Sequence, residues 1–326
     1  MKTLNKKKID DSYKRIKSII LKTPLVTNET VNRIANANVF FKLENLQYTG
    51  SFKLRGASNK ISKLSEEDKS KGIVAYSSGN HAQAVSYASK LYKISNTIIM
   101  PKNAPKNKIE NTKKYGSKII LYNNLFESRE KIALNIASKE NKIVIKPYDD
   151  LDIIAGQGTV GKEISEQLLE YKINPDIYLC CCGGGGLIAG SSTYIKNIFP
   201  KIKIYSVEPK NFNDTELSLK NKKIIYNKKN SNSICDALLA PRPGKVTFPI
   251  NKRLITKGIS VTDQQVKEAI IFLAENLKIV VEPGGAVATA ALLNKKIKFD
   301  KKNVIIMISG GNIDYSLFSF IAKNQK

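Results

Sequence analysis

The sequence predicts an α/β protein of two doubly wound lobes, with a ligand site in the cleft between them. Apolar segments typical of strands alternate with segments of helical spacing, which favours parallel sheets covered by helices on both faces. A β-α-β-α-β-α-β series occupies residues 70–146, and a second series runs from about residue 176 onwards. We therefore expect a small domain of residues 69–146 and a large domain of residues 1–68 plus 147–326, with ligands near the C-terminal ends of the strands.

The elements before residue 150 alternate regularly. An apolar run at residues 39–44 predicts a strand, and residues 56–67 have helical spacing. The next seven elements alternate between strand and helix, beginning with a strand, at residues 72–78, 79–92, 96–101, 104–116, 118–122, 125–140 and 142–147. This order is typical of a parallel sheet.

The second half of the chain contains three clear strands. Residues 176–199 predict a strand, a glycine-rich loop and a helix, and residues 201–209 and 303–312 predict two more strands. Residues 220–260 begin with a basic, Asn-rich part and continue with "APRPGKVTFP". We predict an irregular surface segment there.

The composition indicates a cytoplasmic globular protein. Hydrophobic residues make up 42% of the chain, which is ordinary for a protein with a packed core. No apolar run approaches the length of a transmembrane helix, so we expect no membrane association. Asp10 and Asp11 stand where a signal peptide would have an apolar stretch, which predicts a protein of the cytoplasm.

The formal net charge of +26 raises the alternative of a nucleic-acid-binding protein. Such proteins gather their lysines on one face or in a tail, whereas the lysines here are spread along the whole chain beside abundant Asn and Ile. We interpret this as a chain-wide compositional bias and expect an enzyme with a solvated basic surface and no nucleic-acid partner. A salt-sensitive gel shift would support the alternative.

The four cysteines do not predict a metal site. Cys180, Cys181 and Cys182 are adjacent, so they alternate faces in a strand and cannot all bind one ion. Cys235 adds no spacing typical of zinc ligands. We expect small buried hydrophobic residues in a reducing compartment.

Four consecutive glycines predict an anion site. Gly183, Gly184, Gly185 and Gly186 stand between an apolar strand and a helix, where backbone N–H groups converge and the helix dipole is positive. A tight turn would need one or two glycines, so we favour phosphate binding over a simple turn. No Lys-Ser/Thr pair follows, which excludes a nucleotide P-loop.

The segment "GQGTVG" at residues 156–161 matches a dinucleotide-binding pattern, with Asp176 twenty residues on. That motif requires an apolar strand just before its first glycine, and here an acidic, short segment precedes it. We predict instead the start of a helix with small packing residues.

The segment "SSGNHAQA" predicts a second polar turn before a helix. Ser77, Ser78, Asn80 and His81 would direct donors toward a crevice, and such a turn suits a carboxylate. No GxSxG elbow surrounds a Ser78–His81 pair, so hydrolysis is not indicated. For His81, positioning without chemistry and a chemical role both stay open.

Lys53 stands in "TGSFKLRGA", between two apolar residues at a turn before a helix. Shielding by apolar groups would lower the pKa of its amine and make it a nucleophile that can form a Schiff base with an aldehyde cofactor. A lysine of this kind, a phosphate cradle and a carboxylate-binding turn together suit a pyridoxal phosphate enzyme that acts on an amino acid. A solvated surface lysine is the alternative.

Five segments in one order now point to a family. "ENLQYTGSFKLRGA", "SSGNHAQA", "PYDDLDIIAGQGT", "GGGGLIAG" and "ISGGN" resemble the serine/threonine dehydratase and serine racemase family of pyridoxal 5'-phosphate enzymes. The resemblance runs from about residue 15 to 315 and implies the fold type II architecture, which is similar to tryptophan synthase β, with the cofactor in the cleft and bound to the large domain.

The resemblance implies a role for each matching cofactor residue. Lys53 matches the Schiff-base lysine, Phe52 an aromatic residue against the cofactor, and Asn80 the partner of the ring hydroxyl. Gly183–Gly186 matches the phosphate loop, and Ser309 matches the residue that faces the pyridine nitrogen. A hydroxyl there would leave that nitrogen unprotonated and favour rapid β-elimination.

The resemblance also implies substrate and metal residues. Ser77, Ser78 and His81 belong to the turn that binds the substrate carboxylate, and Ser78 matches the racemase acid/base on the face opposite the lysine. Arg129 matches an arginine that reaches the substrate and would suit 3-hydroxyaspartate, although a surface helix arginine is the alternative. The segment "EPKNFND" is similar to a divalent-metal segment, with ligands for Mg²⁺ or Ca²⁺ from Glu208, the Phe212 carbonyl and Asp214.

We therefore predict an L-threonine/L-serine ammonia-lyase that forms a 2-oxo acid and ammonia, with Lys53 as the general base. Serine racemase and 3-hydroxyaspartate dehydratase or racemase are the alternatives. Ala237 stands where the family commonly has glycine, which implies a narrower pocket. The family forms homodimers or homotetramers, and the chain leaves no room for a C-terminal regulatory domain.

Overall fold

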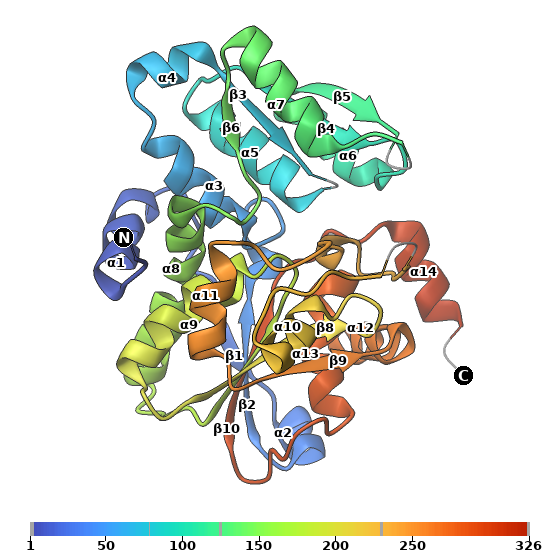
Figure 1. Cartoon of the computed structure of the whole chain (residues 1–326). Coiled ribbons are helices and arrows are strands. Elements are labelled where there is room, and N and C mark those ends of the chain that lie inside the picture. The colour runs from blue at the N-terminus through green and yellow to red at the C-terminus, as the bar shows by residue number, and fades with distance from the viewer. Residues whose placement is uncertain (1–2, 78, 124–125, 229–230, 325–326) are drawn as a thin grey trace.

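The computed structural model describes residues 3–77, 79–123, 126–228 and 231–324. It contains two parallel-sheet domains, which confirms the predicted fold class (Figure 1). We call the domain of the four-stranded sheet the small domain, at the top of Figure 1, and the domain of the six-stranded sheet the large domain.

The small domain has the strand order β5-β4-β3-β6, with all neighbours parallel. Its strands are β3 (Ile73–Tyr76), β4 (Asn96–Pro101), β5 (Lys118–Tyr122) and β6 (Ile143–Ile145), and its helices are α5 (Asn80–Leu91), α6 (Lys106–Lys114) and α7 (Arg129–Glu140). Alternate strand residues pack on opposite faces: Ile73 and Ala75 contact the core beneath α5, whereas Val74 and Tyr76 contact Ala133 of α7. The predicted alternation of elements is confirmed, and the boundaries at residues 69 and 146 stay a prediction.

The large domain has the strand order β1-β2-β10-β7-β8-β9, in which β1 is antiparallel to β2 and the other described neighbours are parallel. Its strands are β1 (Leu25–Thr27), β2 (Asn38–Leu43), β7 (Ile177–Cys181), β8 (Lys203–Pro209), β9 (Lys257–Val261) and β10 (Asn303–Ile308). The remaining helices of the chain are α1 (Lys6–Ile16), α2 (Glu29–Ala35), α3 (Lys53–Ser62), α4 (Glu66–Lys71), α8 (Leu151–Glu170), α9 (Gly186–Ile198), α10 (Asp214–Asn221), α11 (Thr247–Leu254), α12 (Asp263–Leu277), α13 (Pro283–Leu293) and α14 (Tyr315–Lys323), with 3₁₀ turns η1 (Glu44–Leu46) and η2 (Asp236–Leu238). The neighbouring strands β7 and β10 are buried on both faces and therefore read as continuous apolar runs.

Three predicted elements have different limits in the structure. The helical spacing over residues 56–67 divides into α3 and α4, because Ser65 caps a new helix by accepting a hydrogen bond from the Asp68 N–H. Helix α7 begins at Arg129 because the Ser128 side chain caps it. Within residues 220–260, the described residues 223–228 and 231–235 form no helix or strand, as predicted. Residues 236–260 contain η2, α11 and most of β9, so the prediction of an irregular segment was wrong for that part.

The segment "GQGTVG" lies inside α8, so the prediction of a helix start was wrong. The helix begins earlier because the Asp150 carboxylate accepts hydrogen bonds from the N–H groups of Asp152 and Ile153. The prediction of small packing residues is confirmed, since a Cβ atom at Gly156 would lie 2.6 Å from the Arg55 carbonyl oxygen of α3. A Cβ atom at Gly161 would likewise lie 2.5 Å from the Ser191 carbonyl oxygen of α9.

Four charged side chains with no exposed surface link β2, α3 and α8. The Arg55 guanidinium donates to Glu44 at 2.7 Å and to Glu163 at 2.8 Å, and Lys42 Nζ lies 2.8 Å from Glu163. Each charge is paired within this network, which is the condition for burying ions at a tolerable cost. Because Arg55 is two residues from Lys53, the network anchors the start of α3.

The four cysteines are buried and free of disulfide bonds, as the sequence predicts. None of the described helices has both the length and the apolarity that a bilayer-spanning helix requires.

Candidate active site

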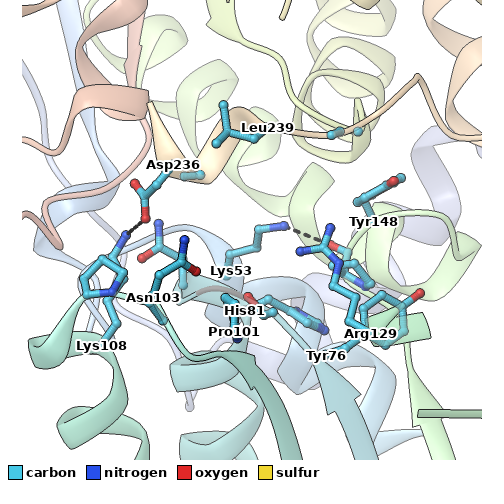
Figure 2. Close-up of a pocket in the computed structure, with 18 of the residues that line it drawn as sticks. Lys53, Tyr76, His81, Pro101, Asn103, Lys108, Arg129, Tyr148, Asp236 and Leu239 are labelled. Atoms are coloured by element: carbon cyan, nitrogen blue, oxygen red, sulfur yellow. Dashed lines mark hydrogen bonds and ion pairs between the residues drawn. The ribbon is translucent and has the colours of Figure 1, made fainter. Parts of the chain in front are cut away.

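A cavity of about 320 Å³ lies between the two domains, at the C-terminal ends of strands from both sheets (Figure 2). Lys53 points into its centre, and His81 and Arg129 of the small domain reach it from below. Ser77 and Asn80 also line it. The structure therefore brings the predicted lysine, the predicted carboxylate-binding turn and the predicted arginine together.

Lys53 is the first residue of α3, and its position depends on the large-domain sheet. The Phe52 N–H donates to the Ser309 carbonyl oxygen at 3.1 Å, which fixes the start of the helix at the end of β10. Lys53 Nζ donates to the Pro147 carbonyl oxygen at 2.9 Å and lies 5.3 Å from the Phe52 ring centroid. Lys53 forms no ion pair with a described carboxylate.

Burial lowers the pKa of Lys53 to about 8, and the positive charge of Arg129 acts in the same direction. A substantial fraction of the amine is therefore neutral near physiological pH, as nucleophilic attack and general-base catalysis both require. This is the direction of shift that the sequence predicts for a shielded lysine.

The glycine loop between β7 and α9 has no room for side chains. A Cβ atom at Gly184 would lie 2.3 Å from the Tyr148 ring, and one at Gly185 would lie 2.5 Å from Asn251 Nδ2. Gly185 also has a φ of 88°, in the left-handed region that favours glycine. The loop leads into the N-terminus of the 13-residue helix α9, where the sequence predicts an anion site, and the binding of a phosphate there stays a prediction.

The polar turn before α5 is held by local hydrogen bonds. Ser77 Oγ accepts from the Gly79 N–H at 3.1 Å, and His81 Nε2 lies 3.1 Å from the Ile145 carbonyl oxygen. This contact makes Nε2 the protonated nitrogen, and burial lowers the pKa of His81 to about 3, so the ring is neutral. His81 is thus a positioned, uncharged residue; the predicted residue Ser78 lies outside the described residues.

A narrower cavity of about 40 Å³ adjoins the first and is lined by the predicted cofactor residues. Phe52, Asn80, the glycine loop and Ser309 all face it. The Asn80 side chain donates to Glu282 and accepts from Asn312 Nδ2 at 2.9 Å. Asn80 therefore faces the cavity in a fixed orientation.

Arg129 is the first residue of α7, and its guanidinium carbon lies 5.9 Å from the Tyr76 ring centroid. Among the described residues no carboxylate forms an ion pair with it. The alternative of an ordinary surface arginine does not account for this position, because Arg129 lines the same cavity as Lys53.

The residues present fit pyridoxal phosphate. The glycine loop leaves a side-chain-free cradle for a phosphate, and Lys53 offers an amine with a lowered pKa between that cradle and the polar turn. Ser309, which carries a hydroxyl, lines the narrower cavity together with the glycine loop. An aldehyde, a phosphate and a ring nitrogen each have a suitable partner.

The predicted metal residues form a buried acidic pair. The Glu208 carboxylate accepts from the N–H groups of Thr215 and Glu216 at 2.9 and 2.7 Å, and Asp214 accepts from Asn227 Nδ2 at 2.6 Å. Burial, together with the charge of Asp214, raises the pKa of Glu208, and burial raises the pKa of Asp214 to about 7. The buried Asp214 Oδ2 has no hydrogen-bond partner in the described part of the chain.

This pair fits a hard cation, because an added positive charge would stabilise both carboxylates and give the unpaired oxygen a partner. No cluster of three or more His, Cys, Asp or Glu side chains suited to a metal occurs among the described residues. The Phe212 carbonyl and water would therefore have to complete such a site.

Four residues of the site were not predicted from the sequence: Tyr148, Lys108, Asp236 and Glu282. Tyr148 follows Pro147 in "PYDD", and its ring packs against Gly184. Glu282 carries a local signal, since it precedes Pro283 and two glycines at the start of α13. Lys108 carries none, because it stands among other lysines in α6.

The fold and the site together define a pyridoxal phosphate enzyme of fold type II. The model of the pyridoxal-phosphate dependent enzyme family matches residues 16–310, and the chain belongs to this family.

Three similar proteins of known activity cover nearly all of this chain. It is 37% identical to the L-threonine ammonia-lyase of Thermotoga maritima, over 96% of this chain and 77% of that protein. It is 39% identical to the L-threo-3-hydroxyaspartate ammonia-lyase of Saccharomyces cerevisiae, over 97% and 95% of the two chains. It is 40% identical to the serine racemase of Dictyostelium discoideum, over 98% of each.

The solved structures agree with this result. Maize serine racemase superposes with a TM-score of 0.92 at 36% identity, over 98% of each chain. The predicted resemblance is confirmed.

Proposed function

We propose that this protein is an L-threonine and L-serine ammonia-lyase that releases a 2-oxo acid and ammonia. The observation that carries the proposal is Lys53, a shielded amine with a pKa of about 8 beside a phosphate cradle. The L-threonine ammonia-lyase of Thermotoga maritima supports this choice of substrate.

The cofactor, when bound, supplies an aldehyde that joins an amine and a conjugated ring that withdraws electrons from the substrate Cα. The N–H groups of Gly183–Gly186 would hold its phosphate, the Phe52 ring would lie against it, and the Ser309 hydroxyl would face its ring nitrogen. Asn80 would present its side-chain amide to the ring hydroxyl. Each of these residues would thus form one bond or contact with the cofactor, and all of them line the same narrower cavity.

The small domain would bind the amino acid. The turn at Ser77 and Asn80 offers donors for the substrate carboxylate, and neutral His81 maintains the turn through its bond to the Ile145 carbonyl oxygen. Lys53 Nζ would then accept the Cα proton as the general base. The β-hydroxyl would leave as water with a proton that balances the one accepted by Lys53. The resulting enamine tautomerises to an imine, and hydrolysis of the imine gives the 2-oxo acid and ammonia.

Arg129 favours a second candidate substrate, L-threo-3-hydroxyaspartate. Its guanidinium faces the cavity without a carboxylate partner among the described residues, so a substrate with a second carboxylate would fill that role. The yeast relative that acts on this substrate supports the candidate.

Racemisation of serine is a third activity that we infer for the same site. The Dictyostelium relative supports it, with Ser78 as the proposed acid/base opposite Lys53. Ser78 lies outside the described residues, so this assignment rests on the sequence.

We also infer an Mg²⁺ or Ca²⁺ site at Glu208, Asp214 and the Phe212 carbonyl, a homodimer or homotetramer, and a location in the cytoplasm. The unpaired Asp214 Oδ2 supports the metal. Calcium should raise the melting temperature of the protein, and should do so less in Asp214→Asn. An equal response of the two proteins would argue against this metal site.

A substrate panel tests the proposed function. The protein, loaded with pyridoxal phosphate, is given L-threonine, L-serine and L-threo-3-hydroxyaspartate separately, while 2-oxo acid is measured and residual serine is resolved by chirality. Oxo acid from threonine or serine supports the ammonia-lyase, and no oxo acid from any of the three contradicts it. D-serine alone would assign a racemase.

Arg129→Met separates the substrates. If Arg129 binds a second carboxylate, activity on hydroxyaspartate should fall about 100-fold while activity on threonine falls much less, because charge-assisted pairs contribute about 1.5–3 kcal/mol. Arg253→Met, at an exposed position of α11, is the matched control. An equal loss on both substrates would contradict a side-chain-specific role for Arg129.

A further inference from the structure

Lys108 and Asp236 lie on the side of the cavity opposite Arg129 (Figure 2), and together with Glu282 they connect the two domains. Lys108 belongs to α6 of the small domain, whereas Asp236 and Glu282 belong to the large domain. Lys108 Nζ lies 2.7 Å from Asp236 Oδ2 and 3.1 Å from Glu282 Oε2. A single ammonium therefore joins two large-domain carboxylates across the cleft.

The contact is buried. The side chains of Lys108 and Glu282 are 2% and 1% exposed, whereas that of Asp236 is 29% exposed. Burial alone would lower the pKa of Lys108, but Glu282 and Asp236 together raise it above its ordinary value, so the ammonium stays charged. Removing the ammonium would leave the buried Glu282 carboxylate without its cationic partner, which costs more than breaking a surface ion pair.

The stem of Lys108 also lies against the predicted substrate-binding turn. A Cβ atom at Gly79 would lie 2.1 Å from Lys108 Cδ. Gly79 has a φ of 175°, outside the left-handed region, and the Lys108 stem is the nearest group that a side chain added at residue 79 would meet. Lys108 thus contacts the turn with its methylene groups and the large domain with its ammonium.

Glu282 transmits the contact to Asn80. One carboxylate oxygen of Glu282 accepts from Lys108 and the other accepts from the Asn80 amide. The Asn80 carbonyl oxygen in turn accepts from Asn312 Nδ2 at 2.9 Å. The amide of Asn80 therefore has one orientation only while Glu282 acts as an acceptor on both oxygens.

We propose that Lys108 is a positioning residue that holds the turn at Gly79 and Asn80 of the small domain against the large domain. Its effect on substrate binding rests on the proposed function, since the turn is the site assigned to the substrate carboxylate. Lys53 and the glycine loop, which would hold the aldehyde and the phosphate of the cofactor, lie outside α5 and α6. Asn80 is the one proposed cofactor residue that Lys108 reaches through Glu282, so cofactor affinity should depend on Lys108 less than substrate binding does.

The test uses Lys108→Met, which keeps the stem and removes the charge, and Asp236→Asn, which weakens one of the two pairs. Lys113→Met, at an exposed position of the same helix, is the matched control. Three quantities are measured on the cofactor-loaded full chain: the dissociation constant of pyridoxal phosphate, KM and kcat, and hydrogen exchange at the amides of Gly79 and Gln83. These two amides donate to Ser77 Oγ and to the Gly79 carbonyl oxygen.

In Lys108→Met we expect KM to rise about tenfold, because apparent affinity falls in proportion to the population of the binding-competent state. Exchange at the two amides should accelerate, while kcat and the cofactor dissociation constant stay within about twofold. Asp236→Asn should show the same changes at about a third of the size, and Lys113→Met should show none.

Unchanged KM or unchanged exchange in Lys108→Met would overturn the proposal, as would a loss of cofactor affinity as large as the rise in KM. If Lys108→Met does not fold, Asp236→Asn decides the matter by the same readouts. If the wild-type protein turns over none of the substrates, the proposed function fails, whereas the exchange data still decide whether Lys108 positions the turn.

Discussion

Lys53 and Lys108 face one cavity from opposite domains, and their surroundings give them opposite properties. Lys53 has a carbonyl oxygen as its described partner, and burial lowers its pKa to about 8. Lys108 is also buried, but two carboxylates raise its pKa. Burial alone therefore does not lower the pKa of a lysine in this cavity. The two lysines differ because two carboxylates pair with Lys108, whereas no described carboxylate forms an ion pair with Lys53.

Lys53→Ala gives the largest effect that this comparison predicts. Turnover should fall at least about 1000-fold and the visible absorbance of the bound cofactor should disappear, because both the point of attachment and the general base are lost. Absorbance spectra and 2-oxo acid release measure the two effects. Lys90→Ala, at an exposed position of α5, is the control; attachment that persisted in Lys53→Ala would assign the cofactor to another lysine.

Arg55→Met extends the comparison to a third buried cation. Its partners are Glu44 of η1 and Glu163 of α8. Removing it leaves Glu44 and Glu163 buried without their main partner, so the free energy of unfolding should fall by about 3–5 kcal/mol. Urea unfolding measures this change, and exposed Arg33→Met should alter it by less than about 0.5 kcal/mol. A loss below about 1 kcal/mol in Arg55→Met would show that the network contributes little to the fold.

The pH dependence of cofactor attachment sharpens the contrast between the two lysines. Only the neutral amine of Lys53 attacks the aldehyde, so the attachment rate of cofactor-free protein should rise about tenfold per pH unit below pH 8 and then level off. Because the charge of Arg129 helps to lower this pKa, Arg129→Met should move the midpoint upward. A midpoint near the ordinary value of 10.5 would show that the amine is not shielded.

Gly79→Ala should have the smallest effect and tests the stem of Lys108 rather than its charge. The added methyl group would displace Cδ of Lys108. We expect KM to rise about threefold, because the population of the binding-competent state would fall. The same substitution in a Lys108→Ala background should add nothing, and a double-mutant cycle measures the difference. Equal costs in both backgrounds would mean that another neighbour limits residue 79.

The sequence predicts best those parts of the site whose residues lie close together in the chain. Lys53 between apolar residues and four glycines between a strand and a helix each carry their signal within about ten residues. Lys108 does not, because its partners Asp236 and Glu282 lie 128 and 174 residues away. Ion pairs over such separations follow from the packing of the domains, and no spacing rule predicts them.

The errors in the predicted elements have local causes. The pattern "GQGTVG" suggested a helix start, but Asp150 caps the helix earlier and the glycines serve the packing of α3 and α9. In residues 220–260, frequent Asn, Pro and Lys masked helix α11, whose Phe248 and Asn251 are buried. Tertiary contacts there outweigh low intrinsic propensity.

The order of the strands in the six-stranded sheet has a consequence for how the protein folds during its synthesis. Strand β2 pairs on one side with β10, whose register joins Phe40 to Ile305, so one edge of β2 has no partner until residues 303–308 have been synthesised. Helix α3 starts where the Phe52 N–H donates to the Ser309 carbonyl oxygen, so Lys53 reaches its final position only after that late strand docks. On the ribosome, a chain shorter than about 309 residues would hold the lysine without its site, and cofactor attachment would mark the end of folding rather than an early step.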